Sequence, residues 1–352
     1  MDCQKFDEQV VRLDTEIAAI ARDYVLARVT NMRGVNLNVF TFDYDLTWMA
    51  FVIDADERIY ARYGSRESQR AEDQLSLGGL RYTLRQALAA YRRGEKPPPP
   101  AAEPPRSAEQ YPAAQRLKAD ACIHCHEVYN FRNEQQFAAG TWTKDDIWSY
   151  IHPPPRSVGL ALDVDRGDHV KAVAPDSPAA RAGLRPGDVL RRLNGQSVLS
   201  IADAQYALHL APRAGSIPVT WRRDGQEQSG TLELPAGWRQ SDISWRTSMW
   251  NLPPAASVYG KDLTAEEKRK LGLAEKRLAF RQGQFVPPAA KRAGIREGDV
   301  ILGVAGRELA MTMLEFNAHV RLTYTVGDTV TYELIRDGRR LQVPVTLPGK
   351  PF

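Results

Sequence analysis

The sequence predicts a multidomain protein of mixed α/β and β class, with separate parts that follow one another along 352 residues. Three observations support this class. A run of six prolines lies between Glu95 and Pro105, and such a run forms an extended spacer rather than part of a core. The segment 181–190 recurs as 292–301, which indicates a duplicated domain. A cysteine and histidine motif at 122–126 lies between these two features.

The composition is that of an ordinary globular protein, with 43% hydrophobic and 26% charged residues. The formal net charge of +4 is small and there is no long basic run, so we expect no nucleic acid partner. No apolar stretch approaches the roughly 18 residues needed to cross a bilayer. The three cysteines are too few for a disulfide framework. No export signal is visible at the start of the sequence, so for an exported protein we expect it to have been removed.

The proline run, the cysteine motif and the repeat divide the chain into six stretches. They are an α/β part at 1–95, a proline-rich linker at 96–106, a small helical segment with the cysteine motif at 107–155, the first repeat copy at 156–236, a Trp- and Pro-containing connector at 237–262, and the second copy at 263–349.

The first part alternates helical and strand patterns. Apolar residues at helical spacing predict a helix over 3–22, and a strand is expected over 24–29. The run 49–53 predicts a buried strand, and acidic turn residues then lead to an antiparallel partner at 59–63. A final helix is expected over 68–93.

The run Met49 to Gly64 resembles the central hairpin of thioredoxin-like proteins, so we expect a degenerate thioredoxin-like α/β domain at 1–95. The resemblance fails where that family carries its chemistry. Only Cys3 is present where a Cys-x-x-Cys pair would lie, and Thr47-Trp48-Met49 stands where a cis-proline would precede the hairpin. Both departures argue against dithiol exchange.

Cys122-Ile123-His124-Cys125-His126 matches the attachment signature of c-type cytochromes. Two thiols three positions apart reach the two vinyl groups of one porphyrin edge, and the next histidine then lies under the iron. The resemblance therefore implies a covalently bound haem c, with Cys122 and Cys125 as attachment points and His126 as the proximal ligand.

Other chemistries remain open for this motif. A zinc site normally needs four ligands, and a redox dithiol normally follows a strand inside a thioredoxin unit. For the sixth position on a haem iron, His152 is the first candidate and Met249 the second, and an open position is a third alternative.

The two repeat copies carry a second resemblance. Val158-Gly159-Leu160 followed by Asp176-Ser177-Pro178 and the decapeptide Arg181 to Leu190 resembles the bacterial PDZ domains of high-temperature-requirement proteases. The second decapeptide, Arg292 to Ile301, marks the other copy. No Gly-x-Ser-x-Gly motif and no protease domain can be identified beside them. We therefore expect two PDZ-like mixed β domains without their protease.

The resemblance implies a peptide site in each copy. In that family a glycine loop receives the terminal carboxylate of a peptide, and the next strand accepts the peptide by strand addition. We assign Val158, Gly159 and Leu160 to this role, with 200–210 as the facing helix. In the second copy the corresponding prediction is Leu271, Gly272 and Leu273, with an acceptor strand at 274–278 and a helix at 312–320. His209 and His319 are expected at equivalent places in the two helices.

Taken together, these motifs predict an exported, periplasmic haem c protein that transfers electrons or senses redox state or a ligand. It would dock to protein C-termini through its first PDZ copy and exchange electrons with a redox partner protein. One alternative is a periplasmic peptide-binding scaffold or adaptor in which haem is structural or absent. A second alternative is a thiol-disulfide oxidoreductase. We expect no protease activity.

Overall fold

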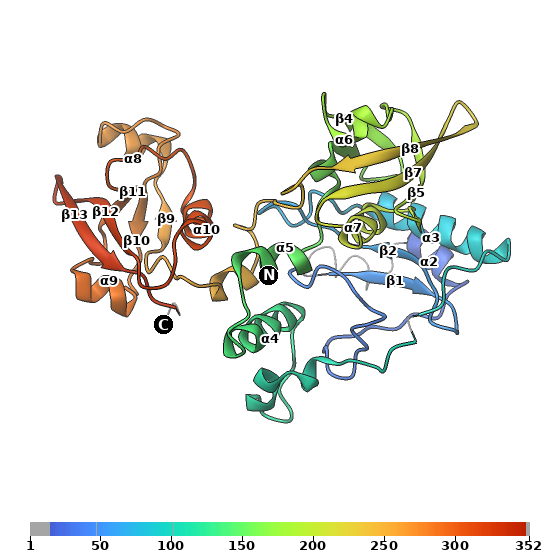
Figure 1. Ribbon diagram of the computed structural model, residues 1–352, viewed down its shortest axis with the longest axis horizontal. Coiled ribbons are helices and arrows are strands. Elements are labelled where there is room, and N and C mark those ends of the chain that lie inside the picture. The colour runs from blue at the N-terminus through green and yellow to red at the C-terminus, as the bar shows by residue number, and fades with distance from the viewer. Residues whose placement is uncertain (1–14, 47, 101, 350–352) are drawn as a thin grey trace. The chain divides into compact units, whose positions relative to one another are not determined.

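A computed structural model describes residues 15–46, 48–100 and 102–349. The chain divides into two compact units, with the boundary between Ser241 and Asp242. Cys3 and the part of the expected helix before residue 15 lie outside the described residues. The mixed α/β and β class is confirmed, since helices alternate with four antiparallel sheets among the described residues (Figure 1).

The first unit begins with what we call the N-terminal layer, which consists of α2 (Thr15–Ala21), β1 (Ala50–Ile53), β2 (Ile59–Tyr63) and α3 (Leu77–Arg92). The predicted hairpin is confirmed, with β1 and β2 antiparallel from Ala50 opposite Tyr63. The Asp54 carboxylate closes its turn by accepting the backbone N–H groups of Asp56 and Arg58, both at 2.9 Å.

Two expectations for this part are wrong. No strand forms over 24–29, and Val25 there is 98% exposed, because β1 and β2 pair only with each other among the described strands. The helix expected from Ser68 starts at Leu77, where the Ser76 hydroxyl caps it by accepting the Gly79 N–H at 2.8 Å. Residues 68–75 form turns instead.

The segment after the proline run is helical. It contains η1 (Ala108–Gln110), η2 (Pro112–Arg116), α4 (Cys125–Ala138), η3 (Lys144–Asp146), α5 (Ile147–Tyr150) and η4 (Pro155–Val158). Hydrogen bonds join α4 to α5; among them, the Tyr129 hydroxyl donates to the Tyr150 carbonyl at 2.9 Å and the Asn133 amide donates to the Tyr150 hydroxyl at 3.0 Å. This segment belongs to the same compact unit as the N-terminal layer.

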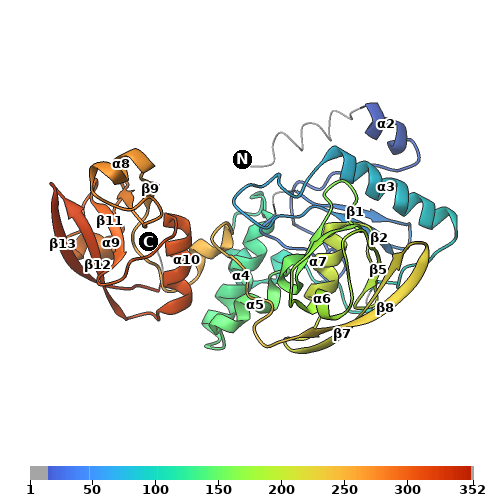
Figure 2. The same cartoon turned by 90° about the horizontal axis from the view of Figure 1, so that it is seen from above.

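The first module completes this unit. Its elements are β3 (Leu160–Leu162), β4 (Val170–Val173), α6 (Pro178–Arg181), β5 (Val189–Leu193), β6 (Gln196–Ser197), α7 (Ile201–His209), β7 (Gly215–Arg223) and β8 (Gln226–Leu234). The strands form a β6-β5-β7-β8 sheet and a β3-β4 pair, joined by a bridge between His169 and Val189. Helix α7 lies between the β1–β2 hairpin and the β5–β7–β8 sheet (Figures 1 and 2).

The second unit holds the second module. Its elements are η5 (Ser248–Asn251), β9 (Gly260–Asp262), α8 (Ala265–Lys270), β10 (Phe280–Gln282), α9 (Pro288–Ala293), β11 (Val300–Val304), α10 (Met313–Thr323), β12 (Thr329–Arg336) and β13 (Arg339–Thr346). One antiparallel sheet runs in the order β13-β12-β11-β10-β9. The sheet therefore starts at Gly260, within the stretch expected to be a connector.

The repeated decapeptide forms the same ion pair twice, each time on a buried aspartate. In the first module the Arg223 Nε donates to the Asp188 carboxylate at 2.7 Å, and the same guanidinium also donates to the Gly183 carbonyl. In the second module Arg336 binds Asp299 at 2.7 Å and donates to the Gly294 carbonyl. Because Asp188 and Asp299 are both buried, each needs this partner, which explains why the Gly-Asp of the repeat is retained in both copies.

Candidate peptide-binding site

The first module presents an unpaired strand edge at β3. Strand β3 pairs only with β4 among the described strands. The Gly159 carbonyl accepts the Ala174 N–H, so Gly159 and Ala161 face β4 and the alternate residues Leu160 and Leu162 face the other way. We call the backbone of Leu160 and Leu162 the β3 edge. It has the form that an added peptide strand requires.

The loop before this edge is held by one glycine. Gly159 has a φ of +84°, a left-handed conformation that L side chains avoid. A Cβ at this position would also run into the Cβ of Ser177, at the cap of α6. The neighbours Val158 and Leu160 are both buried in the module core. The predicted residues Val158, Gly159 and Leu160 thus lie together directly before the β3 edge.

The second module places its equivalent loop elsewhere than expected. Leu162 pairs with Val170, which exchanges hydrogen bonds with the decapeptide loop of the first module. Gly260 pairs with Gln282, which makes the same two bonds to the second decapeptide loop. Gly260 is therefore equivalent to Leu162, and Val258, two residues earlier, is equivalent to Leu160. The second loop is therefore Ala256-Ser257-Val258, and Ser257, with a φ of +61°, replaces Gly159.

The expectation for Leu271, Gly272 and Leu273 differs from the structure. These residues end α8: the Gly272 N–H donates to the Arg269 carbonyl and the Leu273 N–H to the Lys268 carbonyl. That pattern is a helix C-cap, and the glycine is there because the cap needs its φ of +67°. The acceptor strand expected over 274–278 is a turn.

The strand edge of the second module is already bonded to its own helix. The Asn317 side-chain amide donates to the Val258 carbonyl at 3.0 Å. At the other end of β9, the Met313 N–H donates to the Asp262 carboxylate at 2.8 Å. Val258 corresponds to Leu160 and Asp262 to Val164. Helix α10 therefore occupies the Val258 carbonyl, a backbone acceptor that an added peptide would use, and it also binds the Asp262 side chain at the far end of β9.

Both expected helices are confirmed, with caps at Ser200 and Thr312. Counting from these caps, His209 is equivalent to Arg321, so the expected equivalence with His319 is wrong by two positions. His209 stacks on His152 with 4.0 Å between ring centroids, and Arg321 lies 5.3 Å from the Trp250 ring. Burial lowers the pKa of His209 to about 4 and that of Arg321 to about 10.

The N-terminal layer is packed against the first module through a site that the sequence did not reveal. The Arg62 N–H of β2 donates to the Asp203 carboxylate of α7 at 2.9 Å, and the Ser200 hydroxyl donates to the Arg62 carbonyl. The Arg62 guanidinium lies 3.4 Å from the centroid of the Tyr206 ring. Burial raises the pKa of Asp203 to about 6 despite the attraction of Arg62. No local pattern marks this pair, because its partners are far apart along the chain.

The cysteine motif lies at the start of α4. Cys122 and Cys125 are both free thiols, and Cys125 opens the helix. Between them, Ile123 is fully buried; its N–H donates to the Asn31 side-chain carbonyl and its own carbonyl accepts the Met32 N–H. Burial raises the pKa of the Cys125 thiol, which favours its protonated form. The Nδ1 atom of His126 is buried without a hydrogen-bond partner among the described residues.

The two further ligand candidates lie in different units. His152 is buried in the first unit against His209, and Met249 is fully buried in η5 of the second unit. Within the described ranges, no three side chains of His, Cys, Asp or Glu converge as a metal site would require.

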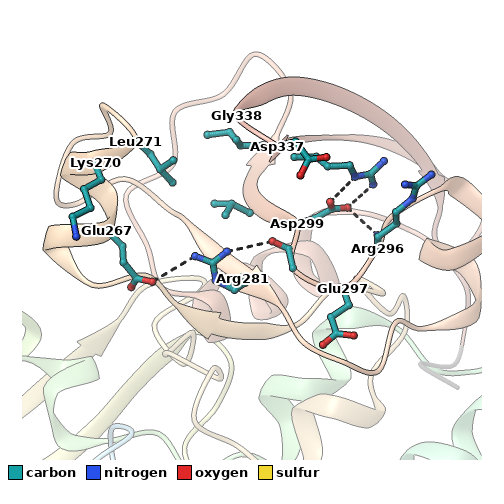
Figure 3. Close-up of a pocket in the computed structure, with 13 residues that line it drawn as sticks. Glu267, Lys270, Leu271, Arg281, Arg296, Glu297, Asp299, Asp337 and Gly338 are labelled. Atoms are coloured by element: carbon teal, nitrogen blue, oxygen red, sulfur yellow. Dashed lines mark hydrogen bonds and ion pairs between the residues drawn. The ribbon is translucent and has the colours of Figure 1, made fainter.

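A pocket of about 530 Å³ opens in the second module between α8, the decapeptide loop and the β12–β13 turn (Figure 3). Its charged lining is balanced, with Lys270, Arg281, Arg296 and Arg336 against Glu267, Glu297, Asp299 and Asp337. Arg281 pairs with Glu267 and Arg336 with Asp299. The pocket therefore favours no particular sign of ligand charge.

Comparison with known proteins points to the first module. A family model described as PDZ domain matches residues 169–223. A probable periplasmic serine protease of the do/HhoA-like type from Haemophilus influenzae is 28% identical over 184 residues, which cover 50% of this chain and 36% of that protein. The periplasmic serine endoprotease DegP of Escherichia coli K12 is 29% identical over 145 residues, 41% of this chain and 27% of that protein.

The chain thus spans little more than a third of the length of these curated relatives, or less. Among solved structures, it is similar to the HtrA3 PDZ domain bound to a phage-derived ligand, with 23% identity, 21% of this chain and 63% of that chain covered, and a TM-score of 0.18. It is also similar to the HtrA-type protease AlgW with decapeptide, with 22% identity, 36% and 39% covered, and a TM-score of 0.23. The chain therefore contains a PDZ domain of the HtrA/DegP type and is a distant homologue of the DegP-like serine proteases.

Proposed function

We propose that this chain is an exported, periplasmic peptide-binding adaptor whose first module holds the C-terminal segments of other proteins. The observation that carries the proposal is the unpaired β3 edge, which directly follows the left-handed Gly159 in a module of the PDZ type. The periplasmic placement is supported by the curated relatives, whose names describe periplasmic proteases. No helix within the described ranges is long and apolar enough to span a membrane.

The second module serves a different purpose in this proposal. Its edge acceptor at Val258 is taken by Asn317, and an added strand would have to displace that bond. We assign the second module to packing or to protein contacts rather than to peptide capture.

The test uses the full-length protein and a display library of random decapeptides with free C-termini, followed by fluorescence anisotropy of the selected peptides. Binding should require the carboxylate, so the C-terminal amide of the same peptide should bind at least tenfold more weakly. Gly159→Ala should abolish binding, because it introduces a Cβ into the space of Ser177. Gly225→Ala is the matched control: it has a φ of +79° but open space around it. Equal binding of acid and amide would refute the proposal.

A second candidate function, electron transfer or redox and ligand sensing by a bound haem c, is favoured by the free thiols and by His126. The residues fit a covalently attached haem: both thiols are unpaired, burial favours the protonated form of the Cys125 thiol, and the Nδ1 atom of the half-buried His126 imidazole has no hydrogen-bond partner among the described residues. When bound, haem would supply one-electron chemistry. Cys122 and Cys125 would hold it, with His126 as proximal ligand and His152 or Met249 as candidates for the other position.

The remaining alternative, thiol-disulfide exchange, is supported less well. A raised thiol pKa opposes the thiolate that such chemistry needs. The likeness of residues 1–95 to a thioredoxin-like domain stays part of this proposal, and it rests on the β1–β2 hairpin alone.

Absorption spectra decide between adaptor and haem protein. If the protein binds haem c, protein produced in a periplasm with a cytochrome c maturation system should keep its pigment after acid–acetone extraction. Cys122→Ser with Cys125→Ser should then lose covalent pigment, and His126→Ala should keep it with altered bands. A colourless wild-type protein would contradict the haem hypothesis and would not affect the proposed adaptor function.

A further inference from the structure

We propose that Tyr44 and Tyr129 form a one-electron relay, which supplies an electron to an oxidant held at the cysteine motif and keeps the resulting radical inside the first unit. This activity goes beyond peptide capture. It concerns the motif of the second candidate function, where a bound haem c would be the oxidant. Its test attaches a different oxidant to the motif and therefore does not depend on haem.

Tyr44 is the first ring of the relay, next to the cysteine motif. Its side chain is buried, and burial raises the pKa of its hydroxyl, with the nearby Cys125 acting in the same direction. The effect of Cys125 places the thiol within electrostatic range of the phenol. The Tyr44 hydroxyl itself donates to the Phe40 carbonyl at 3.3 Å. An oxidant attached to the motif therefore meets Tyr44 as an oxidisable neighbour.

The rings of Tyr44 and Tyr129 are in contact with each other. Their centroids are 5.2 Å apart and their planes cross at 70°, the edge-to-face arrangement that aromatic pairs favour. Tyr129 lies on α4, three residues after His126, and both tyrosines are buried. Because the electronic coupling between two groups falls steeply with distance, rings in contact exchange an electron readily. Tyr44 thus connects the motif with Tyr129.

Tyr129 has a base within reach of its phenolic proton. A tyrosine gives up an electron far more readily when this proton leaves with it. The Tyr129 hydroxyl donates to the Tyr150 carbonyl at 2.9 Å and lies 3.4 Å from a carboxylate oxygen of Asp43. The carboxylate is the group of the two that can be protonated. Asp43 is 3% exposed, so the proton would remain inside the protein.

The transfer balances as one electron and one proton. The oxidant gains one electron from Tyr44, and Tyr44 regains one from Tyr129. The O–H bond of Tyr129 breaks, and its proton forms a new O–H bond on the Asp43 carboxylate. The products are the reduced oxidant, an unchanged Tyr44, a neutral Tyr129 radical and a protonated Asp43.

The relay ends at Tyr129, although a third tyrosine lies against it. The centroid of the Tyr150 ring is 4.6 Å from that of Tyr129. The Arg132 guanidinium lies over the Tyr150 ring, 5.1 Å from its centroid, and the Tyr150 hydroxyl accepts the Asn133 amide. A fixed positive charge beside a ring opposes the loss of an electron from that ring. We therefore expect the radical on Tyr129.

The test places a photosensitiser at the motif of the full-length protein. Cys3→Ser with Cys125→Ser leaves Cys122 as the single thiol, and a ruthenium tris-bipyridyl maleimide labels its exposed side chain. A laser flash in the presence of an external electron acceptor then produces a one-electron oxidant at this position. We expect the electron paramagnetic resonance spectrum of a tyrosyl radical, formed at least about twofold more slowly in deuterated water. If no tyrosyl radical forms, the relay is wrong and both candidate functions are unaffected.

Conservative variants of this labelled protein locate the radical. Tyr44→Phe and Tyr129→Phe should each lower the radical yield about fivefold or more, because each removes the phenol and keeps the ring. Tyr82→Phe is the matched control, since its hydroxyl also donates to a carboxylate, that of Asp168 at 3.0 Å, but its ring lies beside His169. Equal yields in the three variants would overturn the relay. Should Tyr129→Phe not fold, the comparison of Tyr44→Phe with the control decides.

The proton acceptor has a separate test. Asp43→Asn keeps the size of the side chain and removes the base, so it should also lower the radical yield about fivefold. A yield equal to that of the labelled parent protein would refute Asp43 as the acceptor.

Discussion

At the residue scale, the clearest difference between the modules is the side chain at the left-handed position of the loop. Gly159 and Ser257 hold φ values of +84° and +61° at equivalent sites. A serine in this conformation carries a penalty of roughly 1 kcal/mol, and the buried Ser257 hydroxyl also lacks a hydrogen-bond partner among the described residues. The second module has thus kept the backbone shape of the loop without the residue that makes the shape easy to adopt.

A reciprocal exchange should therefore give opposite results. We predict that Ser257→Gly raises the free energy of unfolding of the second unit by up to about 1 kcal/mol. Gly159→Ser should lower that of the first unit by roughly 2 kcal/mol, because its new Cβ would overlap Ser177. Differential scanning calorimetry measures both. If Gly159→Ser instead raised the free energy of unfolding of the first unit, the predicted overlap with Ser177 would be wrong.

At the scale of elements, helix α7 carries two buried groups that titrate with opposite consequences. The pKa of His209 falls from 6.5 to about 4, chiefly through burial, with nearby Arg239 acting in the same direction. The pKa of Asp203 rises from 3.8 to about 6, since burial outweighs the attraction of Arg62. Between pH 6.5 and 4 the unfolded chain takes up a proton at His209 that the folded chain refuses, which destabilises the fold. Over nearly the same range the folded chain takes up a proton at Asp203, which stabilises it.

We predict that replacing one of these two groups reveals the pH dependence of stability that the other group causes. His209→Gln should make the first unit gain stability as the pH falls from about 6.5 to 4, by on the order of 3 kcal/mol. Asp203→Asn should make it lose a similar amount over that range. Urea unfolding at pH 7, 5.5 and 4.5 provides the measurement. Parallel pH profiles for both variants would contradict the assignment.

Elements with a strong local signal were predictable, and those that depend on a partner were not. The hairpin of β1 and β2 and the caps at Ser200 and Thr312 follow from turn and capping residues close in sequence. The expected strand over 24–29 has the right residues but no neighbour to pair with. Leu271-Gly272-Leu273 looked like a peptide loop because glycine serves equally well as a helix C-cap.

At the scale of the whole molecule, the two compact units should unfold as separate cooperative transitions. Leu208 lies in the core of the first module and Phe316 in that of the second, and both are fully buried. We predict that Leu208→Ala lowers the stability of one transition by about 3 kcal/mol and Phe316→Ala that of the other by about 4 kcal/mol. Each variant is the control for the other in calorimetry. A shift of both transitions in either variant would show that the units unfold together.

The sequence by itself determined the duplicated modules, the loop at Gly159, the facing helices and the cysteine motif, because each of these is specified by residues within one short segment. Only the tertiary structure decided which strand edge is available. Asn317 occupies the edge of the second module. This contact joins residues separated by many positions in the chain, so that no local pattern of residues encodes it, and it depends on how closely the folded elements can approach.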